Sequence, residues 1–191
     1  MAATEVSGRA FLGLTRFVKD AGGADLLREL VSACPDTTQR VFQSPIRALD
    51  WHPYDAYVGL LGALEEKMGA SRPMFARRLG EIAGQRDLGT ILRVYVALAS
   101  AERLIRACRK IWPSYYRNAG VMEAITWKSD DTRLRIFEFP AMAPAHCRLM
   151  EGWMASTMQT IGFQVQGGVR ETLCMSRGAP FHEFVCTWTK R

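Results

Sequence analysis

Apolar residues recur every three or four positions along the first part of the chain, which is the period of an amphipathic helix. Pro35 and Pro113 end two of these stretches, because proline lacks the amide proton that continues a helix. Gly22, Gly23 and Gly69 mark further ends. The pattern predicts helices at residues 8–19, 24–33, 53–68, 72–84 and 88–112.

After Pro113 the period changes from about 3.6 residues to about 2, which is typical of half-buried β-strands. Residues 121–127 and 134–139 alternate apolar and polar side chains. Ser129, Asp130 and Asp131 lie between them and favour a turn. These observations predict a first β-hairpin.

A further helix and a second hairpin follow. Residues 147–160 have helical period, and Gly162 ends the helix. Residues 163–174 predict a strand with a bulge at Gly167 and Gly168, and residues 182–188 predict its partner. This order predicts an α+β fold, in which N-terminal helices precede two β-hairpins flanking a crossover helix and a small antiparallel sheet is covered by helices.

The 191 residues are enough for one compact unit, within which we expect a helical extension at 1–50 and an α+β ligand-binding domain at 51–191. No run of about 18 apolar residues predicts a membrane span. The N-terminus has neither the basic nor the apolar part of a signal peptide. We therefore expect a cytoplasmic protein, whose five cysteines are free or metal-bound.

The formal net charge of +6 is concentrated in one stretch of the chain. Between Arg72 and Arg117, ten basic residues accompany three acidic ones. Such a stretch favours either a solvated helix face or binding to nucleic acid or an acidic partner. No base-reading motif accompanies it, so we prefer the solvated face and keep nucleic-acid binding as a third hypothesis.

Candidate metal ligands lie near the C-terminus, where Glu171, Cys174 and His182 follow one another and Cys147 opens the preceding helix. Carboxylate, thiolate and imidazole are ligands of tetrahedral metal sites. Residues three apart on a regular strand point to opposite faces, so convergence requires the strand to end or bulge after Glu171. The alternative is that both cysteines are buried free thiols, Glu171 is exposed and His182 binds a backbone group.

Three segments resemble a superfamily of ligand-binding domains. Its members include the 4-vinyl reductase domains, the haem-nitric-oxide-binding domains and the small core subunits of the TRAPP tethering complex. Residues 111–115 (Ile-Trp-Pro-Ser-Tyr) resemble a Tyr-Pro-Ser segment of the haem-nitric-oxide group, and residues 139–162 resemble the superfamily's crossover helix. Residues 171–184 resemble the ending of 4-vinyl reductase domains. Residues 75–80 (Phe-Ala-Arg-Arg-Leu-Gly) also resemble uncharacterised myxobacterial proteins of this length.

The resemblance to 4-vinyl reductase domains implies a structural zinc bound by Cys, Glu, Cys and Cys. These positions fall on Cys147, Glu171, Cys174 and His182, and the last departs from the family in having His. Zinc also accepts imidazole as a ligand. The resemblance therefore implies zinc as the cofactor.

The haem-binding relatives use a proximal His in the helical region and a Tyr-x-Ser-x-Arg motif on the strands. Residues 133–139 lack that motif, and His52 is the one His before the first hairpin. On these grounds the sequence argues against haem.

The resemblance implies a sensory or regulatory module for a small hydrophobic or aromatic ligand. We predict an apolar pocket between the long helix and the sheet, lined by Leu98, Ile105, Trp112, Trp127, Phe137 and Trp153. The module would signal through a homodimer, which these relatives commonly form, or through a regulatory protein partner. The alternative is an assembly subunit without ligand. No phosphate-binding loop or cofactor motif is present, so we do not expect an enzyme.

Overall fold

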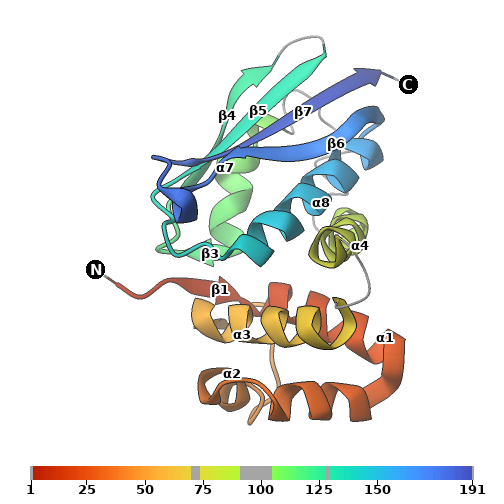
Figure 1. The fold of residues 1–191 in the computed structure, drawn as a ribbon, viewed down its shortest axis with the longest axis vertical. Helices are drawn as coiled ribbons and strands as arrows, with labels where there is room; N and C mark the ends of the chain where they lie inside the picture. Colours follow the sequence, from red (N-terminus) through yellow and green to blue (C-terminus); the bar gives the residue numbers. More distant parts are fainter. Residues whose placement is uncertain (1, 70–73, 91–104, 128–129, 191) are drawn as a thin grey trace. The chain divides into compact units, whose positions relative to one another are not determined.

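The computed structural model describes residues 2–69, 74–90, 105–127 and 130–190. The chain forms two compact units, coloured along the sequence in Figure 1. The first comprises Met1–Ala76 and Ser114–Ala119, and the second comprises Arg77–Pro113 and Gly120–Arg191.

The first unit is mainly helical. Its elements are β1 (Glu5–Ser7), α1 (Gly8–Ser32), α2 (Asp36–Val41), β2 (Trp51–Pro53), α3 (Tyr54–Leu64), a π-helical turn (Glu65–Gly69) and β3 (Tyr116–Arg117). The strands form a small antiparallel sheet in the order β2-β1-β3. The ring of Phe11 on α1 packs edge-on against Tyr57 of α3, and both side chains are buried.

Two features of this unit are not visible in the sequence pattern. The expected boundary at residue 50 falls inside the unit, because β1 pairs with β2 across it. The helix α2 follows Pro35 and was not predicted, because its six residues are too few to reveal a period. The two helices predicted at 8–19 and 24–33 are the two halves of α1, which has non-helical backbone at Gly22 and Gly23.

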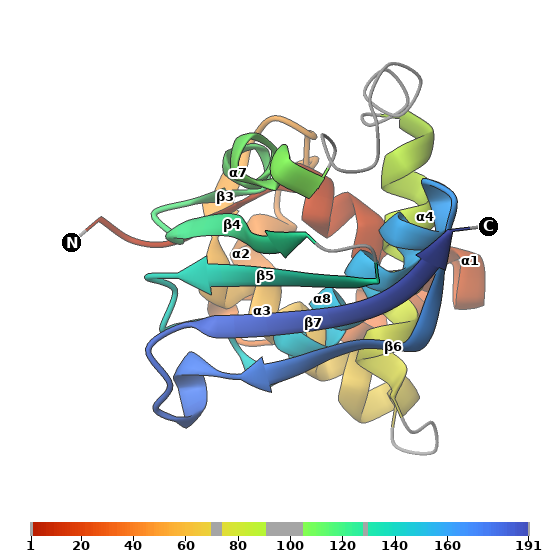
Figure 2. The same ribbon diagram turned by 90° about the horizontal axis from the view of Figure 1, so that it is seen from above.

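The second unit is an antiparallel sheet with helices on one face. Its elements are α4 (Phe75–Thr90, whose first two residues belong to the first unit), α7 (Cys108–Ile111), a 3-10 turn (Trp112–Ser114, whose last residue belongs to the first unit), β4 (Val121–Trp127), β5 (Asp131–Phe137), α8 (Pro144–Thr160), β6 (Phe163–Leu173), a 3-10 turn (Met175–Arg177) and β7 (His182–Lys190). The strand order is β4-β5-β7-β6, and Figure 2 shows α8 behind this sheet. The predicted α+β fold is confirmed. The helix predicted at 88–112 falls largely on residues 91–104, outside the described residues.

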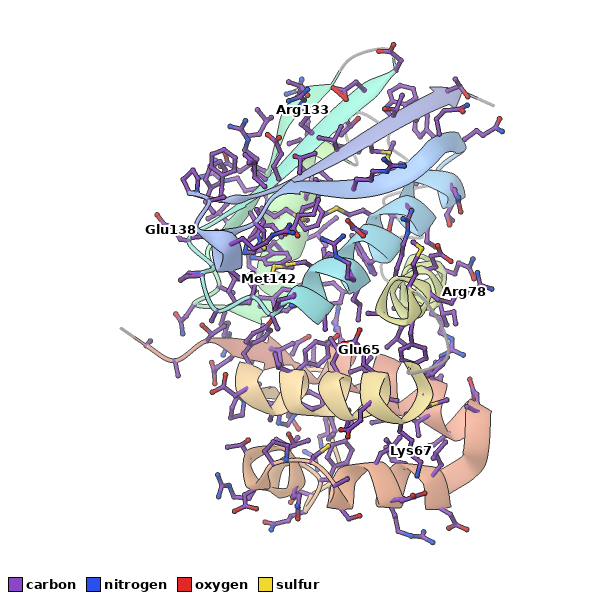
Figure 3. The ribbon with its side chains drawn as sticks, viewed as in Figure 1. Glu65, Lys67, Arg78, Arg133, Glu138 and Met142 are labelled. Atoms are coloured by element: carbon purple, nitrogen blue, oxygen red, sulfur yellow. The ribbon has the colours of Figure 1, made fainter. Side chains whose placement is uncertain are left out.

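The two faces of this sheet have different characters. On β7, the side chains of Phe184, Cys186 and Trp188 alternate onto the face that packs against α8, and all three are buried. Arg133 on β5 points to the opposite face and is exposed (Figure 3). The period-2 pattern therefore separates core from solvent as predicted.

The predicted bulge in β6 is confirmed. The pairing of β6 with β7 shifts between Gln166 and Val169. Gly167 and Gly168 occupy this shift with φ angles of 63° and 82°. Side chains with a Cβ are strained at such angles, so this sequence position favours glycine.

Glycines also let α4 and α8 approach closely. A Cβ on Gly80 of α4 would overlap the carbonyl oxygen of Leu149, and a Cβ on Gly152 of α8 would overlap the carbonyl oxygen of Arg77. The two helix backbones are therefore in direct contact, and α8 is fixed on this side. None of the described helices combines the length and apolar character needed to cross a membrane.

We expect Gly152→Ala to lower the free energy of unfolding by about 1–3 kcal/mol, because the added methyl group forces α4 and α8 apart. Gly62→Ala on α3 is the matched control, since a Cβ added there would meet no atom within 4 Å. The control should be neutral or stabilise by about 0.4–1 kcal/mol through the unfolded state. Urea unfolding curves measure both, and equal stability of the two variants would contradict the close contact.

Candidate functional site: a buried cluster and an apolar cavity

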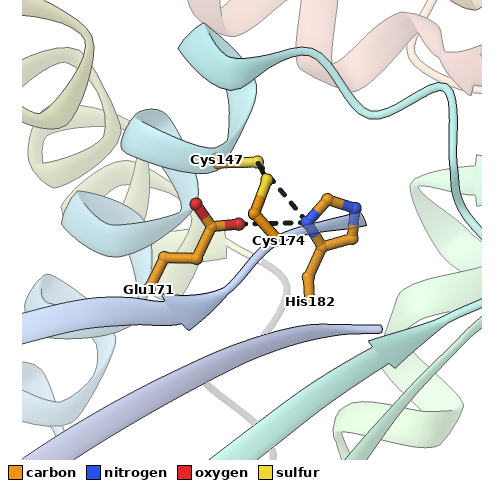
Figure 4. A group of neighbouring side chains, drawn as sticks. All are labelled: Cys147, Glu171, Cys174 and His182. Atoms are coloured by element: carbon orange, nitrogen blue, oxygen red, sulfur yellow. Dashed lines mark hydrogen bonds and ion pairs between the residues drawn. The ribbon is translucent and has the colours of Figure 1, made fainter. Parts of the chain in front are cut away.

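Three elements of the second unit bring four predicted residues together (Figure 4). Cys147 lies in the first turn of α8, which Pro144 opens at a position where proline is well accommodated. Glu171 and Cys174 lie at the end of β6, and His182 is the first residue of β7. The side chains of Cys147, Cys174 and His182 are buried, and the Glu171 side chain is 1% exposed.

The backbone explains how Glu171 and Cys174 face the same point. The pairing of β6 with β7 shifts between Glu171 and Leu173, and β6 ends at Leu173. Cys174 then starts a 3-10 turn. The strand therefore both bulges and ends after Glu171, which meets the condition set by the spacing of the two residues.

The ligand atoms of the four side chains are close. The Cys147 Sγ lies 4.0 Å from the Cys174 Sγ and 3.6 Å from the His182 Nδ1, and this Nδ1 lies 3.0 Å from the Glu171 Oε1. One ligand atom from each residue lies within 4.8 Å of every other. Two sulfurs, one nitrogen and one carboxylate oxygen are a donor set that a metal ion can use.

The imidazole of His182 contacts a neighbouring group with each of its ring nitrogens. Its Nε2 donates to the carbonyl oxygen of Phe139 at 3.2 Å, since a carbonyl can only accept. Its Nδ1 also faces an acceptor, the Glu171 carboxylate. Both ring nitrogens of His182 are therefore engaged within the protein.

The outer oxygen of Glu171 binds two arginines. Its Oε2 accepts from Arg148 at 2.7 Å and from Arg177 at 3.2 Å. The buried Glu151 accepts from Arg148 and from the Glu171 amide, at 2.6 and 2.7 Å. Burial alone raises the pKa of Glu171, but hydrogen bonds from His182, Cys147 and Cys174 and the charge of Arg148 lower it to about 2. The carboxylate is thus ionised at neutral pH.

The cysteines of the cluster are buried as the alternative reading of the sequence expected, and His182 does bind a backbone group. That reading also placed Glu171 on the surface, and its buried side chain contradicts this part. Burial, followed by the effect of the Glu171 charge, raises the pKa of Cys147 far above its usual range. Cys147 is therefore a neutral thiol when no ion is present.

An apolar cavity of about 50 Å³ lies elsewhere in the second unit, lined by residues of α7, α8 and the sheet. Of the predicted pocket residues, Ile105 and Trp153 line it. Trp112 is buried against Phe139, and Phe137 packs against Phe181; neither lines the cavity. Leu98 and the side chain of Trp127 lie outside the described residues.

Sequence reasoning did not find several residues that complete these sites. Arg148 and Arg177 hold the outer oxygen of Glu171, and the first of them follows the predicted ligand Cys147 directly. The sequence could in part have suggested these arginines, because a buried carboxylate requires hydrogen-bond donors on both oxygens. Thr157 lines the cavity on α8, and nothing in its sequence context singled it out.

Comparison with known proteins identifies the fold. No family model matches the chain, and no curated protein matches its sequence. An H-NOX protein from Shewanella oneidensis in the Fe(II)NO ligation state has a TM-score of 0.72 at 12% identity, covering 96% of this chain and 99% of that one. An unliganded Fe(II) H-NOX protein from K. algicida has a TM-score of 0.68 at 12% identity, covering 97% of each chain.

An oxygen-binding H-NOX domain related to soluble guanylate cyclases, in its oxygen complex, has a TM-score of 0.66 at 12% identity, covering 97% of this chain and 95% of that one. The chain therefore has the H-NOX fold, which is the haem-nitric-oxide-binding fold. The comparison supports this part of the resemblance and neither the 4-vinyl reductase nor the TRAPP part.

The cofactor prediction made from the sequence is wrong on this comparison. It took zinc as the cofactor and argued against haem, whereas the solved structures with this fold are H-NOX proteins in Fe(II), NO and CO states. The error has a physical reason. We relied on two short polar motifs, but a fold depends on its hydrophobic pattern and can persist when such motifs change.

We expect Glu171→Gln to lower the free energy of unfolding by about 3 kcal/mol in chelator-treated protein, because it removes one partner of a buried ionic network. Asp25→Asn is the matched control: its ion pair with Arg28 is exposed, so its loss should leave stability unchanged. Urea unfolding at neutral pH measures both. Equal midpoints for the two variants would show that the Glu171 charge does not hold the cluster together.

Proposed function

We propose that this protein is a sensory domain that binds a small molecule and signals to a protein partner. The observation that carries the proposal is the H-NOX fold, which spans nearly the whole of this chain and of the matched chains. One of those H-NOX structures is in an NO-ligated state and another is an oxygen complex. A partner protein or a second copy of this chain would receive the signal.

The chemistry of the three histidines supports a test for haem binding. An iron ligand must offer a neutral imidazole nitrogen. His182 uses both ring nitrogens within its cluster. Burial lowers the pKa of His146 to about 3, and burial also lowers the pKa of His52. Both imidazoles are therefore neutral at physiological pH.

One further observation favours His52 over His146 as the iron ligand. Its Nε2 is buried and has no hydrogen-bond partner among the described residues. A buried polar atom without a partner costs free energy, which a bound ligand can recover. We propose that His52 would hold the iron, which when bound would offer a position for a diatomic gas.

We expect apoprotein reconstituted with haemin to give a Soret band that shifts on addition of NO. His52→Ala should abolish this band, and free imidazole should restore it by replacing the lost side chain. His182→Ala, which removes a histidine committed to the cluster, should leave the band in place in protein that circular dichroism shows to be folded. A wild-type protein without a Soret band after reconstitution would overturn the haem part of the proposal.

We also propose that Cys147, Glu171, Cys174 and His182 bind a divalent metal ion. The support is the convergence of four ligand atoms from buried side chains at one point. A metal ion would displace the proton of the buried Cys147 thiol, because metal ligands bind in deprotonated form. The Glu171 carboxylate is already ionised.

Cobalt(II) tests this cluster, because its thiolate complexes absorb in the visible and near-ultraviolet. We expect one equivalent to give thiolate-to-metal bands, with release of protons to a pH indicator. Cys174→Ser should abolish most of the signal. Cys34→Ser is the control, since Cys34 is also buried but donates to backbone carbonyls in the first unit. Identical spectra from both variants would place the cobalt elsewhere.

A further inference from the structure

The cavity of the second unit has features of a binding site that are separate from the cluster. Its volume of about 50 Å³ is roughly a third of an engineered apolar cavity that binds benzene. Thioether side chains of Met122, Met154 and Met158 form part of its wall, together with the ring of Phe184. Methionine walls adapt to the shape of small guests because the side chain is flexible and polarisable.

No charged side chain lines this cavity among the described residues. Burial raises the pKa of Cys108 to about 11 and that of Cys186 to about 12, so both lining thiols are neutral at physiological pH. An ion entering the cavity would lose its hydration without gaining a counter-charge. The cavity therefore selects uncharged molecules.

One residue of the wall has a hydroxyl group without a partner. The hydroxyl oxygen of Thr157 is buried and makes no hydrogen bond to the described residues. Thr132 also lines the cavity, but its hydroxyl oxygen accepts from the Trp188 indole at 3.0 Å. Water would satisfy Thr157 poorly, because a buried water needs about two to four polar partners. A guest with one hydrogen-bonding atom suits this wall better.

We infer that this cavity binds a small, uncharged and mainly apolar molecule whose single oxygen accepts a hydrogen bond from the Thr157 hydroxyl. The inference names a class of ligand for the proposed sensory function, and to that extent it rests on the proposed function. The apolar walls supply most of the binding free energy, and the hydroxyl selects a guest that carries an acceptor.

Acetone and isobutene test the inference, because they have the same shape and differ in one oxygen. The readout is the NMR signal of ¹³C-labelled methionine methyl groups, with Met122, Met154 and Met158 as reporters. Met142 and Met175, which do not line the cavity, are internal controls. Both probes should shift the reporter signals in the wild-type protein and leave the controls unchanged.

Two variants separate the hydroxyl from the rest of the wall. Thr157→Val keeps the shape and removes the donor, so the Kd for acetone should rise about three- to tenfold while that for isobutene stays within about twofold. Ser156→Ala is the matched control. Its hydroxyl is also buried without a partner among the described residues, but it faces Gly84 of α4 and does not line the cavity. It should change neither Kd.

The outcomes are distinguishable. Reporter signals that do not respond to either probe would overturn the inference outright. Equal effects of Thr157→Val on both probes would overturn the role of the hydroxyl. The haemin test reports on His52 of the first unit, whereas the acetone test reports on methionines of the second unit. A failed haem test with acetone bound would therefore count against the haem part alone. A Soret band without acetone binding would count against the cavity alone.

Discussion

A buried carboxylate that must be satisfied on both oxygens is the constraint on which the second unit depends. Removing an ionised carboxylate from water is costly unless donors replace the water. Glu171 obtains them from His182 on one oxygen and from Arg148 and Arg177 on the other. These donors belong to β7, α8 and the turn after β6. Satisfying one charge therefore fixes the relative placement of three elements.

Close backbone contact at two glycines fixes helix α8 on a second side. Gly80 and Gly152 allow backbone contact between α4 and α8, so that α8 is clamped between α4 and the sheet. These contacts on both sides hold α8 in a fixed position. Cys147 at its start and Thr157 about three turns later then serve two different sites. Any displacement of α8 is shared by the cluster and the cavity.

The sequence predicted elements whose signal is local. Both hairpins, the crossover helix and the bulge at Gly167 and Gly168 followed from period and turn chemistry, and the structure confirms them. The four cluster residues were chosen from their spacing, and the structure brings them together; their metal binding stays a prediction. Glu171 and Cys174 could converge only through a register shift, which spacing could require but not show.

Other features depend on long-range contacts. Strand pairing between β1 and β2 joins segments on the two sides of residue 50, where we expected a boundary. Trp112 and Phe137 were assigned to the pocket because they are large and apolar, yet each packs against a neighbouring ring instead. Thr157 was missed because a threonine within a helix looks ordinary until its hydroxyl is found without a partner among the described residues.

The fold of this protein and the chemistry of its sites depend on different features of the sequence. At 12% identity the H-NOX fold is retained while the polar motifs that we associated with haem are not found in the sequence. A fold sets where helices and strands lie, whereas chemistry depends on a few polar atoms placed on them.

In this chain those atoms fall into two sets. No residue of the Glu171 cluster lines the cavity beside α8, so the cavity can accept an apolar guest. Our two ligand proposals rest on His52 Nε2 and Thr157 Oγ1, which are buried and have no partner in the described part of the chain.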